Sequence, residues 1–179
     1  MITLETERCI LRSFELSDLE DFYEYAKNPN IGPNAGWPPH SNSEVSKEIL
    51  MSFMENEEVW AIVYKEHNKV IGSIGLHKDQ LRTTTDVKML GYVLSEDYWG
   101  LGIMPEAAGA VVDYAFQYLD ISLLTVQHHY RNVRSKRVIE KLGFRYEGTL
   151  RHCTKIFDGT IHDLSCYSMT KDEFLAMRK

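Results

Sequence analysis

Two glycines separated by one residue stand directly before a strongly helical segment. Gly100 and Gly102 permit a tight turn, and from Met104 onward apolar side chains recur at three- and four-residue spacing. Pro105 suits the first turn of a helix, where its missing N–H costs little. Since the free N–H groups of a helix start attract anions, this turn could bind a diphosphate. A plain strand-to-helix turn explains an isolated G-x-G equally well.

Other phosphate-binding motifs do not fit this segment. A mononucleotide P-loop requires G-x-x-x-x-G-K-[ST], which the sequence lacks. A dinucleotide fingerprint requires a third glycine, where this chain has Pro105. A phosphate site at this turn would therefore be of a different kind.

A second polar pair, Asn132 and Ser135, has the spacing of the first turn of a helix. Residues 124–129 have the composition of a strand, Asn132 can cap the helix that follows, and Gly143 ends it. On local sequence alone, capping is the favoured role of both polar side chains.

The metal-ligating residue types are present without a metal-site pattern. His128 and His129 are adjacent on a strand, so their side chains point to opposite faces and cannot readily share one ion. Cys9, Cys153 and Cys166 are odd in number, widely separated and include no C-x-x-C pair. The sequence predicts no metal and three thiols in a reducing compartment.

The elements that must position these residues alternate between helical and strand periodicity. We expect a strand over residues 4–14, a helix with Ser17 as N-cap, a Gly/Pro/Asn-rich loop over 28–42 and a helix over 43–55. Three further strands are expected at residues 59–64, 69–78 and 87–94, joined by polar connections at Asn68-Lys69 and Thr83-Thr84-Thr85 that are short enough for antiparallel pairing.

Length and charge limit the classes of protein. The 179 residues suit one domain over 1–179, and the net charge of −6 disfavours binding to nucleic acid. The N-terminus carries charged residues among its apolar ones, which excludes a signal-peptide core, and no stretch suits a membrane span. We therefore expect a cytoplasmic protein without a membrane partner.

Four segments, in the order in which the family has them, resemble the GNAT N-acetyltransferases, and in particular the RimJ/RimL ribosomal-protein branch of that family. The resemblance extends along the chain through TERCILRSFELSDLEDFYEY, VIGSIGLHK, GYVLSEDYWGLGIMPEA and NVRSKRVIEKLGFRYEG followed by DGTIHDLSCYSM. It implies a mixed α/β fold, a twisted sheet of about seven strands that splays between the fourth and fifth and is flanked by about four helices. Acetyl-CoA would lie in the splay as co-substrate.

The resemblance also assigns roles to individual residues. The main-chain groups of Tyr92 and Leu94 and the side chain of Asn132 would contact the pantetheine arm. Ser135 would lie near the thioester sulfur, where it could protonate the departing thiolate, with Tyr130 as a reserve acid. Lys136 could meet the phosphates of the nucleotide or belong to the solvated surface. The diphosphate would bind the amides of Gly100, Leu101, Gly102, Ile103 and Met104.

The proton acceptor is where this sequence departs from the family pattern. Acetyl transfer needs a neutral amine, and the family often places a Glu on the fourth strand to accept its proton. Met89 occupies that position here, which leaves His77, Asp86 or a water chain. His77 is the preferred candidate because imidazole titrates near neutral pH, although a lone strand histidine is more often a packing residue.

Recognition of the acceptor amine is less defined. Trp37 lies in the Pro-rich loop and is the candidate wall of an acceptor pocket. Tyr92, Trp60 and Tyr167 could add to it, although aromatics on strands are more often core residues. A small amine or a protein N-terminus would fit the activity, and the protein would be a monomer or a homodimer. A noncatalytic acyl-CoA-binding or regulatory module is the alternative, because the expected Glu is missing.

Overall fold

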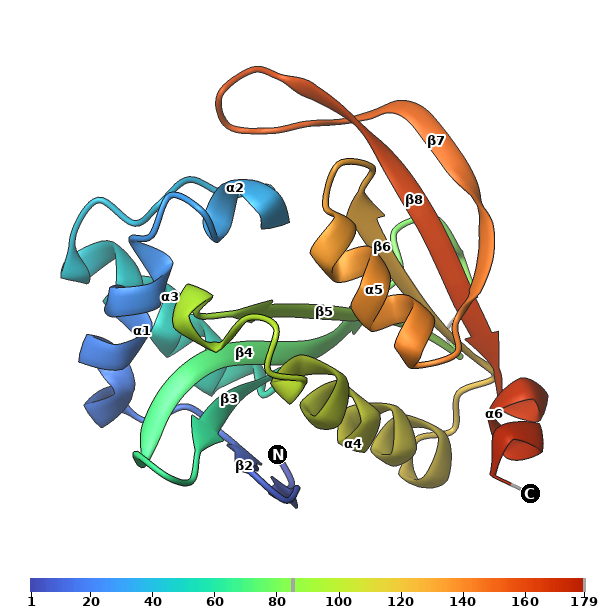
Figure 1. Ribbon diagram of the computed structural model, residues 1–179, viewed down its shortest axis with the longest axis horizontal. Coiled ribbons are helices and arrows are strands. Elements are labelled where there is room, and N and C mark those ends of the chain that lie inside the picture. The colour runs from blue at the N-terminus through green and yellow to red at the C-terminus, as the bar shows by residue number, and fades with distance from the viewer. Residues whose placement is uncertain (85, 179) are drawn as a thin grey trace.

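A mixed eight-stranded sheet with the order β1-β2-β3-β4-β5-β6-β8-β7 forms the centre of the computed structural model, which describes residues 1–84 and 86–178 (Figure 1). The strands are β1 (Leu4–Glu5), β2 (Cys9–Arg12), β3 (Val59–Tyr64), β4 (Lys69–Lys78), β5 (Val87–Leu94), β6 (Leu123–His129), β7 (Arg145–Lys155) and β8 (Ile161–Thr170). The helices are α1 (Leu19–Ala26), α2 (Gly32–Ala35), α3 (Ser43–Asn56), α4 (Ile103–Tyr118), α5 (Val133–Lys141) and α6 (Lys171–Met177), with short 3₁₀ turns η1 (Leu16–Asp18) and η2 (Glu96–Tyr98).

The predicted mixed α/β architecture is confirmed, with small differences in the number of elements. The part of the chain that the structure describes has eight strands because the segment expected as one strand turns back on itself: the Thr6 amide donates to the Cys9 carbonyl, and β1 then pairs with β2. Within the described residues six helices are present, because α2, inside the expected loop, and α6, near the C-terminal end, add to the four predicted ones. Thr85, in the predicted connection between β4 and β5, lies outside the described residues.

The first helix does not begin as predicted. Instead of a Ser17 cap, the Asp18 carboxylate accepts the Glu15 amide at 2.8 Å and both terminal nitrogens of Arg12 at 2.8 Å. The bidentate charged pair with Arg12 holds this carboxylate beside the Glu15 amide. The chain therefore passes through η1 before α1 starts.

Two clusters of apolar residues cover the two faces of the sheet. The strand alternation separates them, since Trp60 and Ile62 of β3 face one cluster and Ala61 and Val63 the other. The first cluster is filled by the buried stripe of α4 together with Ile139 of α5, and the second by α1 and α3. In Figure 1, helices α4 and α5 lie against one face of the sheet, and α1 and α3 lie against the other face near β3 and β4.

The sheet opens between β5 and β6. These two strands pair in parallel only from Val87↔Leu123 to Leu90↔Val126. Beyond that point β5 stays paired with β4 as far as Leu94, and β6 stays paired with β8 as far as His129. The β6-facing edge of residues 91–94 consequently lacks a ladder partner in β6. The splay lies where it was predicted, because β5 and β6 are the fourth and fifth of the strands expected from the sequence.

A buried carboxylate lies at the closed end of the splay. Asp79, 2% exposed, accepts the Thr125 hydroxyl at 2.6 Å and the amides of Leu81 and Arg82 at 2.7 and 2.9 Å. Arg82 completes the group through a 2.6 Å contact with Glu147 on β7. We call these four side chains, Asp79, Arg82, Thr125 and Glu147, the Asp79 clamp; it ties the end of β4 to β6 and β7.

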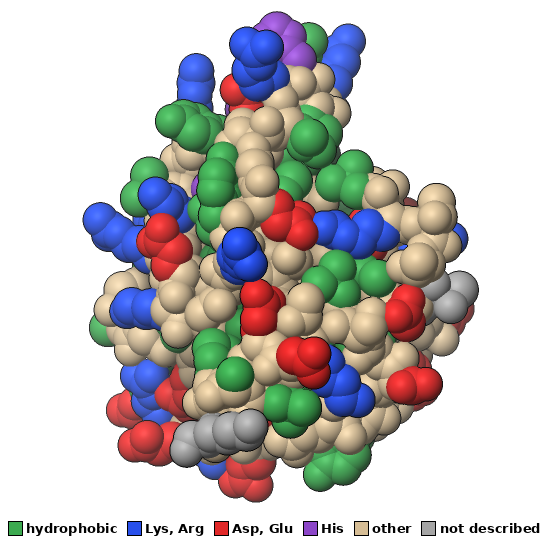
Figure 2. Space-filling view, turned by 90° about the vertical axis from the view of Figure 1, so that its right-hand side faces the viewer, with side chains coloured by type: hydrophobic (Ala, Val, Ile, Leu, Met, Phe, Trp, Pro, Cys, Tyr) green, Lys and Arg blue, Asp and Glu red, His purple; other side chains and the backbone are tan. Residues whose placement is uncertain are grey.

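The surface carries mixed charge. On the face shown in Figure 2, Lys and Arg side chains are interspersed with Asp and Glu over the body of the molecule. In the described ranges 1–84 and 86–178, every helix is too short or too polar to cross a bilayer.

Candidate active site

The Gly100/Gly102 turn has the geometry that its sequence indicated. Both glycines have φ of +78°, a conformation that strains side-chain-bearing residues, and α4 starts directly after Gly102. A Cβ added at Gly100 would meet no atom within 4 Å, so the space beside the helix start is open. The amides of Ile103 and Met104 belong to the first turn, which leaves them without carbonyl partners inside the helix.

Arg8 fixes this turn from the opposite end of the chain. Its guanidinium donates to the Leu101 carbonyl at 2.8 Å and to the Glu106 carboxylate at 2.7 Å. Glu106 also accepts the Thr6 hydroxyl at 2.6 Å, so the first turn of α4 is tied to the β1–β2 turn. Sequence reasoning missed Arg8, because no local pattern connects residues more than 90 positions apart.

The first turn of α5 brings a hydroxyl to the splay. Asn132 caps the helix as predicted, since its side-chain oxygen accepts the Ser135 amide at 3.1 Å. Because the cap uses the amide of Ser135, the Ser135 hydroxyl can bond to another group. It lies 2.9 Å from the phenol oxygen of Tyr92 on β5. We call these two groups, from opposite sides of the splay, the hydroxyl pair.

Tyr92 contributes more than the main-chain contact expected of it. Burial raises the pKa of its phenol to about 12, although the hydrogen bond with Ser135 works in the other direction. The phenol consequently keeps its proton at neutral pH. Two neutral hydroxyls in contact, one on each side of the splay, can pass a proton between them and donate it to a third atom.

The two sides of the splay also meet at its outer end. The Arg134 guanidinium of α5 lies over the Trp99 ring, 4.1 Å from its centroid, next to the glycine turn. Lys136, by contrast, pairs with Glu140 one turn further along α5 at 3.7 Å, and both side chains are about half exposed. The glycine turn and the start of α5 thus face each other, with Lys136 on the solvent side.

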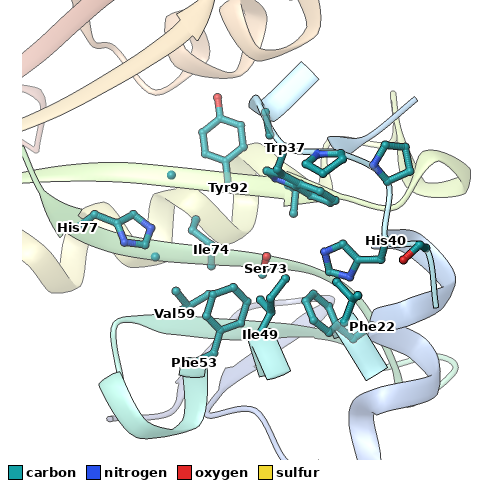
Figure 3. A pocket seen from close by; sticks show the side chains of 18 residues that line it. Phe22, Trp37, His40, Ile49, Phe53, Val59, Ser73, Ile74, His77 and Tyr92 are labelled. Carbon is teal, nitrogen blue, oxygen red and sulfur yellow. The ribbon is translucent and has the colours of Figure 1, made fainter. Parts of the chain in front are cut away.

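A cavity of about 710 Å³ adjoins the splay on the other side of β5. Figure 3 shows its walls: Trp37 and His40 from the loop after α2, Ile49 and Phe53 from α3, and Ser73, His77 and Tyr92 from the sheet. Trp37, the candidate wall residue, thus lines a cavity. Trp60 and Tyr167, for which both wall and core were open, belong to the apolar cluster under α4.

His77 lies in this cavity above two glycines. A Cβ at Gly75 would come within 2.9 Å of the imidazole and one at Gly91 within 3.2 Å, so the bare backbone provides the space for the ring. His77 pairs across the strands with Met89, and its Nδ1 is 3.8 Å from a carboxylate oxygen of Glu58. Burial lowers the pKa of His77, only partly offset by Glu58, so the ring is neutral at pH 7.

The other residues considered for proton transfer or metal binding lie outside this cavity. Asp86 precedes β5 at the closed end of the splay, where a hydrogen bond with Ser122 lowers its pKa, and it does not line the cavity. Tyr130 is 65% exposed and is likewise absent from the cavity wall. His128 binds the His129 carbonyl at 2.8 Å, and the described residues contain no group of three side chains able to hold a metal ion.

Comparison with known proteins identifies the family. The family model "Acetyltransferase (GNAT) domain" matches residues 8–145, which include the glycine turn and the hydroxyl pair. The chain belongs to the GNAT acetyltransferase family. The protein is therefore classed as an acyltransferase, which weighs against a noncatalytic module.

This GNAT chain has full-length relatives. It is 28% identical over 180 residues to the uncharacterized N-acetyltransferase p20 of Bacillus licheniformis, covering 97% of this chain and 99% of the relative. Its fold is shared by the ribosomal-protein-S5-alanine acetyltransferase of Vibrio fischeri, with a TM-score of 0.77, 23% identity and coverage of 97% and 98%. The microcin C7 self-immunity acetyltransferase MccE, solved with acetyl-CoA and AMP, has a TM-score of 0.80, 22% identity and coverage of 92% and 93%.

Proposed function

We propose that this GNAT protein transfers an acetyl group from acetyl-CoA to a primary amine, by direct attack within a ternary complex. One observation carries the proposal: Tyr92 lines the cavity of about 710 Å³ and also belongs to the hydroxyl pair in the splay. We call this cavity the acceptor cavity. An amine in the cavity would reach the thioester carbon of a cofactor in the splay without a covalent enzyme intermediate. The nitrogen–carbon bond forms, the carbon–sulfur bond breaks, and the departing thiolate takes a proton.

The cofactor side of the proposal rests on the glycine turn and the open edge of β5. The diphosphate would accept hydrogen bonds from the amides of residues 100–104, where the open space beside Gly100 admits it. The pantetheine arm would pair with the main chain of Tyr92 and Leu94, which has no ladder partner in β6. Asn132 flanks this path, and the Ser135 hydroxyl would protonate the thiolate, while a phosphate contact by Lys136 would require the Glu140 pair to open.

The most direct experiment is release of free thiol from acetyl-CoA in the presence and absence of an amine panel. Thiol release that depends on the amine, together with a mass increase of one acetyl group on the amine, supports acetyl transfer. A binding module would instead raise its melting temperature with acetyl-CoA and release no thiol. That second outcome would favour the noncatalytic alternative.

The first variant tests the cofactor site. We expect Gly102→Val to weaken acetyl-CoA binding about tenfold or more, because a β-branched residue is strained at a φ of +78° and its side chain would crowd the helix-start amides. Gly109→Ala is the matched control, since an added Cβ there meets nothing within 4 Å. Calorimetric titration of folded variants measures both, and unchanged affinity in Gly102→Val would place the diphosphate elsewhere.

The second variant tests the proton acceptor. A neutral imidazole is needed to take a proton, so kcat/KM should fall as the pH drops through the pKa of His77. Because burial lowers that pKa, the limb should lie below about pH 6.5, the usual value for histidine. His77→Gln is expected to remove the limb and to lower kcat/KM about tenfold. A full pH–rate profile of both proteins checks this.

Restoring the carboxylate provides the control. His77 and Met89 are cross-strand partners, so Met89→Glu would place a carboxylate beside the same amine. We expect Met89→Glu to recover part of the activity of His77→Gln, whereas Met89→Gln, which has the same shape without the charge, should not. If His77→Gln keeps the wild-type profile, the amine must lose its proton to solvent.

A further inference from the structure

The acceptor cavity is uncharged along its walls. None of the eighteen side chains that line it is Asp, Glu, Lys or Arg. Five carry an uncharged polar group, namely Ser41, Ser73, His40, His77 and the phenol of Tyr92, and the rest are glycine or apolar, with aromatic and proline side chains prominent among them. This contrasts with the acidic balance of the chain as a whole.

The two histidines do not introduce charge at neutral pH. His40 is 8% exposed, and its Nδ1 is 2.7 Å from the hydroxyl of the buried Ser46. Burial lowers the pKa of His40, and burial is also the main reason why the pKa of His77 is low. The nearest carboxylate to the ring of His77, Glu58, is outside the set of lining residues and about half exposed.

The far end of the cavity has an aromatic frame. The rings of Trp37 and His40 are 5.2 Å apart, and Phe22 meets His40 edge-on at 5.5 Å (Figure 3). Phe22 in turn packs against Phe53 of α3 at 5.9 Å. Contacts at these distances between facing elements hold the walls in place, and a volume of about 710 Å³ is in the range of small-molecule sites.

We propose that the acceptor is a small molecule with a single amino group and an apolar, aromatic or aliphatic body. This inference rests on the proposed acetyl transfer and narrows its substrate. The amine would lie beside His77 and Tyr92, and the body would lie between Trp37 and the apolar side chains of α3.

Two other acceptor classes fit the walls less well. A polyamine would bury a second ammonium group where no lining carboxylate can pair with it, and burial of an unpaired charge is strongly unfavourable. A protein N-terminus would bring peptide N–H and carbonyl groups into a cavity whose walls offer only five polar side chains. An apolar monoamine requires neither kind of compensation.

The test compares three probes on the wild-type protein with saturating acetyl-CoA: 2-phenylethylamine, spermidine and an alanine-starting tetrapeptide. We expect kcat/KM for 2-phenylethylamine to exceed that for spermidine and for the peptide at least about a hundredfold. A preference for spermidine or the peptide would overturn this inference while leaving acetyl transfer intact. If acetyl-CoA does not bind or no amine is acetylated, the proposed function itself fails.

A charge-gain variant makes the comparison sharper. Val45 is half-buried on α3 and lines the cavity, so Val45→Glu would add the missing carboxylate. We expect Val45→Glu to raise kcat/KM for spermidine about tenfold and to lower it for 2-phenylethylamine, with Val45→Gln as the uncharged control. Equal effects of Glu and Gln would contradict the argument from charge.

A truncation tests the apolar wall independently. Trp37→Ala should raise KM for 2-phenylethylamine about tenfold and leave the affinity for acetyl-CoA unchanged. Tyr118→Ala, on an exposed residue at the end of α4, should change neither quantity. An unchanged KM in Trp37→Ala would show that the aromatic wall does not bind the acceptor.

Discussion

Replacing Ser135 by alanine is expected to lower kcat about a hundredfold while the affinity for acetyl-CoA changes little. The hydroxyl would act chiefly as the thiolate leaves, so its loss affects the transition state more than the bound cofactor. The helix should be unaffected, because Asn132 caps α5 through the amide of Ser135 and not through its hydroxyl. Steady-state kinetics and calorimetric titration measure the two quantities separately, with Ser52→Ala on the exposed face of α3 as control.

Tyr92→Phe determines which member of the hydroxyl pair gives the proton. If Ser135 is the donor, Tyr92→Phe removes only a neighbour at 2.9 Å, and the double variant should be no slower than Ser135→Ala. If Tyr92 is the donor, Tyr92→Phe should be the more damaging change. Full activity in Ser135→Ala would return this serine to a structural role, and full activity in both single variants would contradict a role for the pair.

The largest loss of stability is expected from Asp79→Ala. Removal of this buried carboxylate leaves the Thr125 hydroxyl, two amides and part of Arg82 without their acceptor. Breaking a buried charge pair of this kind costs about 3–5 kcal/mol of unfolding free energy. Urea denaturation at pH 7 measures the loss. Glu24→Gln, which breaks an exposed pair with Lys69, is the control and should stay close to wild type.

The same clamp predicts a pH dependence. Burial alone would raise the pKa of Asp79, but hydrogen bonds from Thr125 and the Leu81 amide, together with Arg82, lower it. The pKa is therefore lower in the folded state than in the unfolded state, so the stabilisation is present at neutral pH and disappears as the pH falls through the folded pKa. The difference between wild type and Asp79→Ala should shrink towards acid pH. A difference that stays constant with pH would mean that the ionised form contributes nothing.

Local sequence patterns predicted the elements well where one short stretch contains the whole signal. The Asn132 cap, the end of α5 at Gly143, with φ of +83°, and the start of α4 after Gly102 all depend on residues within a few positions of each other. The start of α1 did not follow its local pattern. There, Ser17 lies inside η1, its hydroxyl donates to the Glu15 carboxylate, and Asp18 pairs with Arg12.

The candidate site shows the same limit. The glycine turn, Ser135, His77 and Trp37 could be proposed from residue type and neighbourhood. The side-chain role of Tyr92 could not, because its partner is 43 positions away, across the splay. For Trp60 the sequence left wall and core open for a similar reason: its strand is apolar on both faces, and the packing of α4 places the tryptophan in the core.

The short pairing of β5 with β6 has a consequence for how the molecule opens locally. Within the sheet, strands β1 to β5 are joined to β6, β8 and β7 through four residue pairs of β5 with β6 and through the Asp79 clamp. We expect this pairing to open locally at lower free energy than the unfolding of the complete chain, which amide hydrogen exchange would detect. A cofactor that contacts both sides of the splay would join them into one unit, so ligand binding and global cooperativity are linked in this fold.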